Sequence, residues 1–436
     1  MYSKSQKGRI EGEIVVPGSK SHTIRAVLLA AMAEGTSVIR NPLTSDDCLS
    51  ALKAAQSFGA DVEEGEGFWR VKGLSGHIKT PENYVDTGNS GTTTYFVTGM
   101  ATLCEGYTFI TGDHQIRRRP IKPLIDGLNQ LGAEVHITRP DSEAPPVVIH
   151  GPLKGGSVTF SGFSSQNVST VLLSAPMALG ETEIHVEAPL EKPYLQMTID
   201  WMKRFGVSLL KNSGDYKYFA VAPNQKYKAT DAVIPSDWSG VAFPLVCAVT
   251  TPSKAVISGV DFNDAQGDKA VVDHMIAMGA EIEKNVEGGY MTITGGKKLK
   301  GGIEINLNDT PDALPALSVA ACYCDEDVKF TGLAHVRVKE TDRVAVMEKE
   351  LSKMGAVIET GSDYMIVKGK NALKGTVVDS HDDHRVAMAL TIAGMFAEGV
   401  TYVKDAECAS VSFPGFYEAM NRMGAEIALL DEIDVK

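Results

Sequence analysis

The chain has 436 residues and a net charge of −13. This length exceeds the usual size of one hydrophobic core, so we expect two domains. The acidic balance argues against a general binder of nucleic acid or of anionic membranes. No apolar run is long enough to span a membrane, and residues 1–8 lack the apolar core of a signal peptide.

The six cysteines are scattered along the chain, mostly in apolar surroundings. No CxxC pair and no Cys/His cluster has the spacing of a zinc site. We therefore expect free thiols in a reducing cytoplasm. The sequence shows no metal constellation, and we expect no cofactor.

A short phrase returns six times: a large apolar residue, Gly, a small residue, a variable position and an apolar residue. The phrases begin at Phe58, Leu131, Phe205, Met278, Met354 and Met423, and their glycines are 69 to 76 residues apart. Each predicts the end of a helix, because glycine adopts the left-handed C-cap conformation, and an alternating strand follows. The sequence thus predicts one α/β unit used six times, three per domain. The alternative is a set of unrelated segments that share a common cap.

Two Gly/Ser/Thr-rich segments each come before an apolar helix. The first is Pro17–Arg25, before a helix predicted over 26–33, and the second is Asp86–Tyr95. Backbone N–H groups and hydroxyls at a helix start, with Lys20 and Arg25 beside them, can bind an anion. An ordinary capped turn is the other reading of each.

Two further polar segments follow in the first half. Residues 112–120 contain three consecutive arginines, which cannot all point the same way, so only one or two of them can face a ligand. Ser164–Gln166 offers two hydroxyls and an amide before an apolar helix, a composition that suits phosphate oxygens. A solvated basic turn and a simple helix cap are the alternatives.

The last group of polar segments lies in the second half: Asp312 in 310–313, the run 338–343 and the run 382–385. Each opens an apolar stretch and so lies at the end of an element, where sites are built, although helix capping also explains each one. All the segments together predict a small substrate with two or three negative charges. The cations are Lys20, Arg25, Arg119, Lys339, Arg343 and Arg385, and Lys20, Asp312 and Glu340 remain for proton transfer.

The ordered motifs resemble those of the 5-enolpyruvylshikimate-3-phosphate (EPSP) synthase family. They run from Pro17-Gly18-Ser19-Lys20-Ser21 to Asp383-His384-Arg385, and Lys339-Glu340-Thr341-Asp342-Arg343 is the most specific. The resemblance implies an inside-out α/β barrel of two domains, each with three βαβαββ units, helices inside and sheets outside. It places the domains at 20–233 and at 1–19 with 234–436, with the active site in the cleft between them.

The family reaction transfers the enolpyruvyl group of phosphoenolpyruvate to the 5-hydroxyl of shikimate 3-phosphate and releases phosphate. By motif, the contacts of shikimate 3-phosphate are Lys20, Ser21, Arg25, Ser164, Ser165, Gln166 and Lys339. Those of phosphoenolpyruvate are Lys20, Gly91, Arg119, Gln166, Arg343 and Arg385, the last two as a bidentate clamp on its carboxylate. Asn89, Thr92 and Asp312 are further substrate contacts, and the catalytic groups are Lys20, Asp312, Glu340 and His384. The family is generally monomeric.

Four positions depart from the family pattern. Tyr95 stands where an arginine is usual, Val411 where many members have a lysine, Ile24 where asparagine is usual, and His335 where some members have another polar contact. The first two changes remove positive charge from the phosphoenolpyruvate side. They leave open a lyase that eliminates phosphate from shikimate 3-phosphate without phosphoenolpyruvate. An enolpyruvyl transferase for a UDP-sugar and a non-catalytic binding protein are further alternatives.

Overall fold

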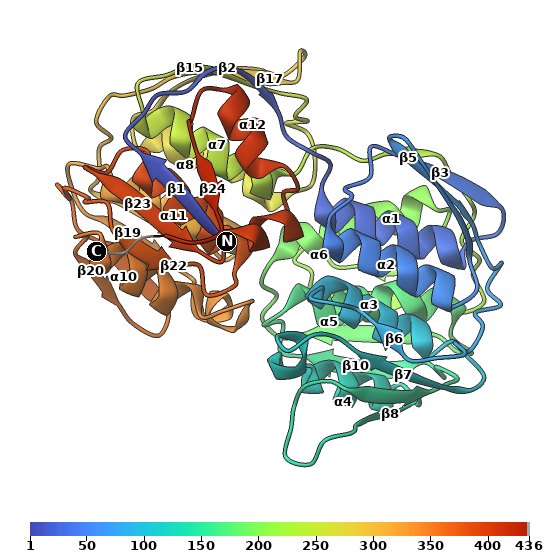
Figure 1. Ribbon diagram of the computed structural model, residues 1–436. Helices are drawn as coiled ribbons and strands as arrows, with labels where there is room; N and C mark the ends of the chain where they lie inside the picture. Colours follow the sequence, from blue (N-terminus) through green and yellow to red (C-terminus); the bar gives the residue numbers. More distant parts are fainter. Residues whose placement is uncertain (434–436) are drawn as a thin grey trace. The chain divides into compact units, whose positions relative to one another are not determined.

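The computed structural model describes residues 1–433 and divides the chain into two compact units (Figure 1). One, here called the N-unit, is Gly18–Pro235, and the other, the C-unit, joins Met1–Pro17 to Ser236–Lys436. The chain therefore passes between the units at Pro17 and again at Pro235. These boundaries lie two residues outside the limits 20 and 233 expected from the sequence.

The N-unit contains three four-stranded sheets. In sheet order the first is β14 (Ala232–Val233), β3 (Thr36–Arg40), β5 (Phe68–Lys72) and β4 (Asp61–Gly65). The second is β6 (Val85–Asp86), β7 (Tyr107–Thr111), β9 (Val147–His150) and β8 (Glu134–Ile137). The third is β10 (Gly156–Phe160), β11 (Thr182–Val186), β13 (Tyr218–Val221) and β12 (Lys211–Asn212).

Up to residue 433, the C-unit also contains three four-stranded sheets. The first is β22 (Val377–Asp379), β23 (Val400–Lys404), β1 (Tyr2–Gln6) and β24 (Ala428–Leu430). The second is β2 (Glu11–Val15), β15 (Lys254–Ser258), β17 (Tyr290–Thr294) and β16 (Glu281–Asn285). The third is β18 (Ile303–Asn306), β19 (Val328–Thr331), β21 (Tyr364–Val367) and β20 (Ile358–Thr360).

All six sheets share one pattern of strand directions: the first pair is parallel and the next two pairs are antiparallel. This is the pattern of a βαβαββ unit, so the prediction of six such repeats is confirmed. Three sheets are completed by a strand from a distant part of the chain. For example, β14 pairs with β3 in the register Ala232↔Ile39, and β1 pairs with β23 in the register Ser3↔Val403.

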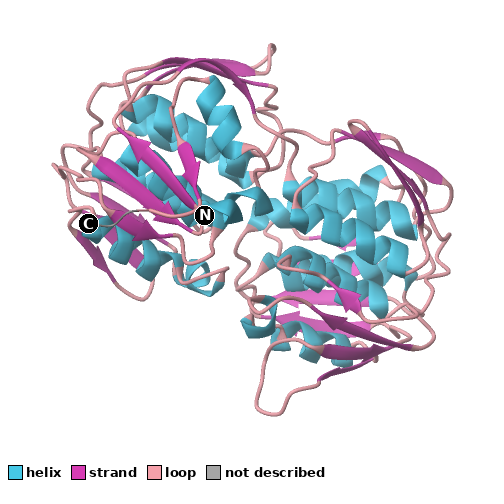
Figure 2. Ribbon diagram, in the orientation of Figure 1, coloured by secondary structure: helices cyan, strands magenta, loops and turns pink. Residues whose placement is uncertain are grey.

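Each unit has three helices that are buried on almost all sides. In the N-unit they are α1 (Lys20–Met32), α3 (Gly91–Ala101) and α5 (Ser165–Ser174). In the C-unit they are α7 (Trp238–Thr250), α9 (Leu314–Cys322) and α11 (His384–Gly394). Beyond their first two turns their residues are mostly small or apolar, the composition of helices with no face toward water. Within each unit these helices contact one another and strands lie around them (Figure 2), so helices inside and sheets outside are confirmed.

The second helix of each repeat buries only one side, as an amphipathic helix does. These helices are α2 (Asp46–Ser57), α4 (Lys122–Gln130), α6 (Lys192–Arg204), α8 (Ala270–Ala277), α10 (Arg343–Lys353) and α12 (Phe416–Arg422). Short 3₁₀ helices are η1 (Ile116–Arg118), η2 (Ala175–Met177), η3 (Gly267–Lys269), η4 (Pro311–Ala313), η5 (Ala334–Val338) and η6 (Ala406–Val411).

The six repeated glycines follow α2, α4, α6, α8, α10 and α12, and their φ angles lie between 82° and 101°. The prediction that each phrase ends a helix is therefore confirmed, since only glycine adopts this conformation without strain from a Cβ atom. The start of the first helix was predicted too late. Lys20 already belongs to α1, so Lys20–Arg25 forms its first two turns and not a loop before it.

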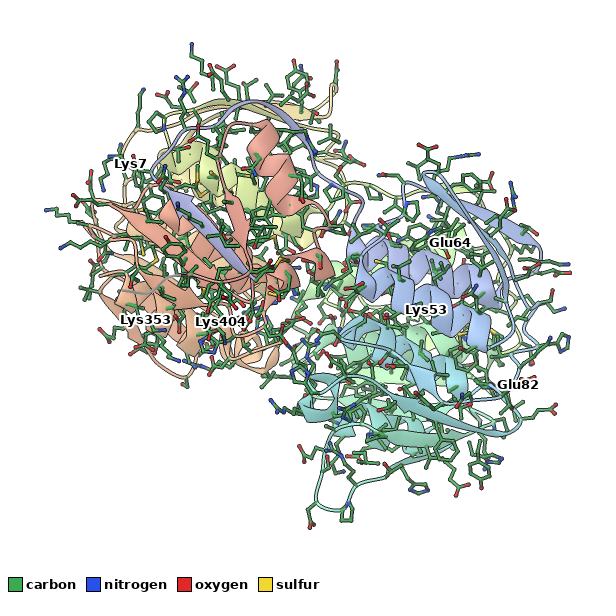
Figure 3. The ribbon with its side chains drawn as sticks, in the orientation of Figure 1. Lys7, Lys53, Glu64, Glu82, Lys353 and Lys404 are labelled. Atoms are coloured by element: carbon green, nitrogen blue, oxygen red, sulfur yellow. The ribbon has the colours of Figure 1, made fainter. Side chains whose placement is uncertain are left out.

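Exposed charged side chains such as Lys53 and Glu82 extend from the surface (Figure 3). None of the helices within residues 1–433 combines the length and the apolar character that crossing a bilayer requires.

Candidate active site

The three buried helices of the N-unit all begin at predicted site residues. Lys20 and Ser21 open α1, Gly91 and Thr92 open α3, and Ser165 and Gln166 open α5. A first helical turn leaves backbone N–H groups without an intrahelical acceptor and carries the positive end of the helix dipole. Polar side chains at these helix starts can therefore act together with backbone N–H groups and the helix dipole, although the rest of each helix is mostly apolar.

Arg25 is a buried cation in the second turn of α1, with 2% of its surface exposed. Its Nε donates to Thr198 Oγ1 at 2.9 Å, and its Nη1 donates to the Ser21 carbonyl at 3.0 Å. Burial lowers the pKa of Arg25 to about 10, and Tyr194 and Glu191 oppose this shift. The side chain thus remains charged at neutral pH and is held in place largely by neutral oxygens.

Hydrogen bonds join the starts of α3 and α5. Gln166 Nε2 donates to Thr92 Oγ1 at 3.0 Å, and the Ser164 hydroxyl caps α5 by accepting from the Gln166 N–H at 3.3 Å. Asn89, just before α3, donates to Asp113 Oδ2 at 2.6 Å. These bonds fix the polar groups of two helix starts against each other.

Arg119 lies against the first residue of α3. A Cβ atom added to Gly91 would collide with Nη1 of Arg119, so the glycine makes room for the guanidinium. Arg119 is partly buried, whereas Arg117 and Arg118 are exposed. Of the three consecutive arginines, Arg119 is therefore the one held at a helix start.

Ser165 is held by a carboxylate that the sequence did not identify. Its N–H donates to Glu191 Oε2 at 3.0 Å and its hydroxyl donates to the same oxygen at 2.8 Å. Glu191 is 3% exposed and has a left-handed backbone, φ 53°, just before α6. The Ser165 hydroxyl could donate to a phosphate only after leaving this carboxylate.

The C-unit gathers its predicted residues around Arg343, whose side chain is fully buried. Nε donates to Asp383 Oδ2 at 2.8 Å, Nη1 to Asp312 Oδ1 at 2.8 Å and Nη2 to Glu340 Oε2 at 2.6 Å, with a further bond from Nη2 to Asp383 Oδ1 at 3.2 Å. Four of its five N–H groups are thus used by carboxylates. A bidentate clamp by Arg343 on a ligand would require at least one of these bonds to open.

Asp312 bridges two arginines, because its Oδ2 also pairs with Nη2 of Arg385 at 3.0 Å. Burial by itself would raise the pKa of Asp312, but Arg385 and Arg343 together hold it well below its ordinary value. Asp312 is therefore ionised at neutral pH and has no proton to donate there. Lys339 and Glu340 also interact electrostatically with this carboxylate, and His384 is buried at the first position of α11.

Three further carboxylates support these residues, and of these the sequence singled out only Asp383, as part of a motif. Asp383 caps α11 by accepting from the Arg385 N–H at 2.9 Å, and Asp47 pairs with Lys20 at 3.0 Å. Asp268 is 2% exposed and accepts from the Ser239 hydroxyl. Burial and, to a lesser extent, the charge of Asp312 raise the pKa of Asp268 to about 7, although the charge of Arg385 opposes this shift.

The structure also places the four residues that depart from the pattern described in the sequence analysis. Tyr95 donates from its hydroxyl to the Pro120 carbonyl at 2.8 Å, and Val411 ends η6. Ile24 is fully buried in α1, and His335 is 2% exposed in η5. Among residues 1–433, no three His, Cys, Asp or Glu side chains are grouped so as to hold a metal ion.

A six-repeat α/β fold whose buried helices begin at groups that can bind anions, with carboxylates nearby, is typical of an enzyme for small anionic molecules. Comparison with known families is then decisive. The sequence model of the family described as EPSP synthase (3-phosphoshikimate 1-carboxyvinyltransferase) matches residues 4–420. The chain belongs to the EPSP synthase family.

Sequence relatives and solved structures support the same family assignment. The chain is 40% identical over 430 residues to the 3-phosphoshikimate 1-carboxyvinyltransferase of Ruminiclostridium cellulolyticum, covering 99% of this chain and 100% of that protein. It is 39% identical to the enzyme of that name from Methanocaldococcus jannaschii, covering 96% and 97%. Among solved structures, an EPSP synthase from Acinetobacter baumannii aligns with a TM-score of 0.82 at 30% identity, covering 98% and 99%.

Proposed function

We propose that this chain transfers the enolpyruvyl group of phosphoenolpyruvate to the 5-hydroxyl of shikimate 3-phosphate and releases phosphate, a step of aromatic amino-acid biosynthesis. The observation that carries the proposal is the family match over residues 4–420, joined to the motif residues that begin α1, α3, α5 and α11. The relatives bear the name of this transferase, and nothing in the comparisons supports a phosphate-eliminating lyase.

In the N-unit, the proposed roles are those of anion recognition. Arg25, Lys20 and Ser21 would bind the ring and carboxylate of shikimate 3-phosphate, and Ser164 and Ser165 its phosphate. The buried charge of Arg25 supports this role, because a desolvated guanidinium held by neutral oxygens attracts an anion strongly. Arg119, Gln166, Lys20 and the Gly91 N–H would take the phosphate of phosphoenolpyruvate, with Asn89 and Thr92 supporting them.

In the C-unit, Lys339 would bind the phosphate of shikimate 3-phosphate, and Arg385 and Arg343 the carboxylate of phosphoenolpyruvate. We expect Arg385 to donate more hydrogen bonds to that carboxylate than Arg343 does. Most N–H groups of Arg343 already donate to Asp383, Asp312 and Glu340.

The proton transfers follow from the balance of the reaction. The 5-hydroxyl oxygen bonds to C2 of phosphoenolpyruvate while its proton leaves to a base and C3 gains a proton from an acid. Loss of phosphate from the resulting tetrahedral intermediate, with loss of a proton from C3, completes the transfer. The ionised state of Asp312 suits a hydrogen-bond acceptor for the 5-hydroxyl and not the acid. Glu340 and Lys20 would then exchange the proton at C3. His384 is a further catalytic residue in the assignment by motif.

We further propose a monomer in the cytoplasm that needs no cofactor and binds no nucleic acid. The six cysteines are buried thiols, which supports a reducing compartment.

The test is phosphate release from shikimate 3-phosphate with and without phosphoenolpyruvate, with the products identified by mass. We expect release only when both substrates are present, together with a carboxyvinyl adduct. Release from shikimate 3-phosphate alone would contradict the proposal and favour the lyase. Glu340→Gln should lower kcat by about 10² to 10⁴, while Glu418→Gln, at an exposed position of α12, should not.

A further inference from the structure

The side chain of Tyr95 contacts the segment that carries Arg119. Tyr95 lies four residues after Gly91 on α3, so the two positions share one face of the helix. The hydroxyl of Tyr95 donates to the Pro120 carbonyl at 2.8 Å. On the same face, Gly91 lies against Nη1 of Arg119. One face of α3 thus contacts both the backbone just after Arg119 and its guanidinium.

A hydrogen bond to the Pro120 carbonyl restrains the backbone of the segment 119–121 that carries Arg119. Proline has no N–H group, so the carbonyl is its one backbone hydrogen-bonding group. Before it, η1 ends with a bond from the Arg119 N–H to the Ile116 carbonyl at 3.2 Å. After it, the Ile121 N–H donates to the Glu143 carbonyl at 2.7 Å. The Tyr95 bond links this segment to the helix whose start Arg119 contacts.

We propose that Tyr95 is a positioning residue that, through its hydrogen bond to Pro120, holds the guanidinium of Arg119 at the start of α3 and so sets the affinity for the phosphate of phosphoenolpyruvate. This inference rests on the proposed function, which assigns that phosphate to Arg119.

The phenol suits this role because it stays a donor. Burial raises the pKa of Tyr95 to about 12, with the charge of Arg119 opposing the shift and that of Glu191 adding to it. At neutral pH the hydroxyl therefore keeps its proton and brings no charge of its own to a phosphate. Tyr95 therefore contributes to phosphate binding by positioning the neighbouring guanidinium of Arg119.

The first experiment compares two tyrosines that make the same kind of bond. Tyr95→Phe removes the bond to Pro120, and Tyr227→Phe removes a bond to the Leu173 carbonyl, also 2.8 Å long and in the same unit. For Tyr95→Phe we expect KM for phosphoenolpyruvate to rise about threefold to tenfold, the factor that one ordinary hydrogen bond provides. KM for shikimate 3-phosphate should stay within about twofold.

Tyr227→Phe should leave both KM values unchanged, whatever it does to the melting temperature. A Tyr95→Phe enzyme with both KM values unchanged, or with both raised equally, would overturn the inference. These outcomes differ from failure of the proposed function, in which the unmodified enzyme forms no carboxyvinyl product at all.

The second experiment tests whether Tyr95 acts through Arg119. In an Arg119→Lys background, which lacks the guanidinium, Tyr95→Phe should change kcat/KM for phosphoenolpyruvate by less than about twofold. An effect as large as in the unmodified enzyme would show that Tyr95 acts by another route and would overturn the inference.

Discussion

Lys20 and Asp47 form an ion pair of 3.0 Å in which the side chains are only 12% and 5% exposed. Lys20 opens α1, and Asp47 lies in the first turn of α2. Because the pair is shielded from water, it fixes the ammonium group more firmly than a surface pair would. The position of a proposed catalytic group thus depends on a neighbouring helix.

We predict that Asp47→Asn lowers kcat about tenfold to hundredfold, since a catalytic group displaced by about 1 Å loses that much. Asp46→Asn provides a matched control, because Asp46 is the adjacent residue in the same helical turn but is exposed. Steady-state kinetics of both variants with saturating substrates measures the effect. Equal kcat values for the two variants would contradict a role for the ion pair.

The contact between Gly91 and Arg119 leads to a second prediction. In Gly91→Ala the new Cβ atom must displace Nη1 of Arg119, and this flexible side chain can move at little cost to the fold. We expect KM for phosphoenolpyruvate to rise about tenfold, equivalent to about 1.4 kcal/mol, with an unchanged melting temperature.

Gly214→Ala is the control for this substitution, because a Cβ atom there meets nothing within 4 Å. It should leave the KM values of both substrates unchanged. If Gly91→Ala instead raises KM for shikimate 3-phosphate alone, Arg119 does not bind the phosphate that we assign to it.

The repeats were predictable from sequence because their signal is local. A glycine at positive φ ends each helix whatever surrounds it, so Gly59 and Gly424 could be identified without any tertiary contact. The motif residues at the helix starts were also identifiable, through the resemblance. The exact start of α1 was not, since Lys20–Arg25 is polar enough to be taken for a loop.

The supporting carboxylates could not be predicted, because they depend on packing. Asp47 reaches Lys20 only where α2 packs on α1, and Glu191 reaches Ser165 only where α6 packs on α5. Either acidic residue, read alone, is an ordinary helix-starting residue. The engagement of Arg343 by three carboxylates was hidden for the same reason, since no spacing in the sequence shows which charges meet.

Asp383 is the buried partner of Arg343, and its side chain is not exposed at all. We predict that Asp383→Ala destabilises the protein by about 3 to 5 kcal/mol, because it removes the carboxylate that accepts two hydrogen bonds from the buried guanidinium and also removes the cap of α11. For a unit of this size the melting temperature should fall by about 6 to 20 °C in a calorimetric scan. Asp325→Ala, at an exposed position of the same unit, should change it little; an equal loss in both variants would contradict the prediction.

Asp268 should make stability depend on pH near neutrality. Its pKa is raised to about 7 in the folded protein, mainly by burial, against an ordinary value of 3.8. Between these values the folded state binds more protons than the unfolded state, so this group favours folding at low pH and its contribution is lost as the pH rises toward about 7.

We therefore predict that Asp268→Asn, which keeps an oxygen to accept from Ser239, removes this dependence. When melting temperatures are measured from pH 5 to pH 8.5, that of the variant should rise relative to that of the unmodified protein as the pH increases. Asp325→Asn, whose carboxylate is exposed, should follow the unmodified protein throughout. Parallel curves for Asp268→Asn and the unmodified protein would mean that Asp268 is already ionised at pH 5, with its charge balanced by Arg385.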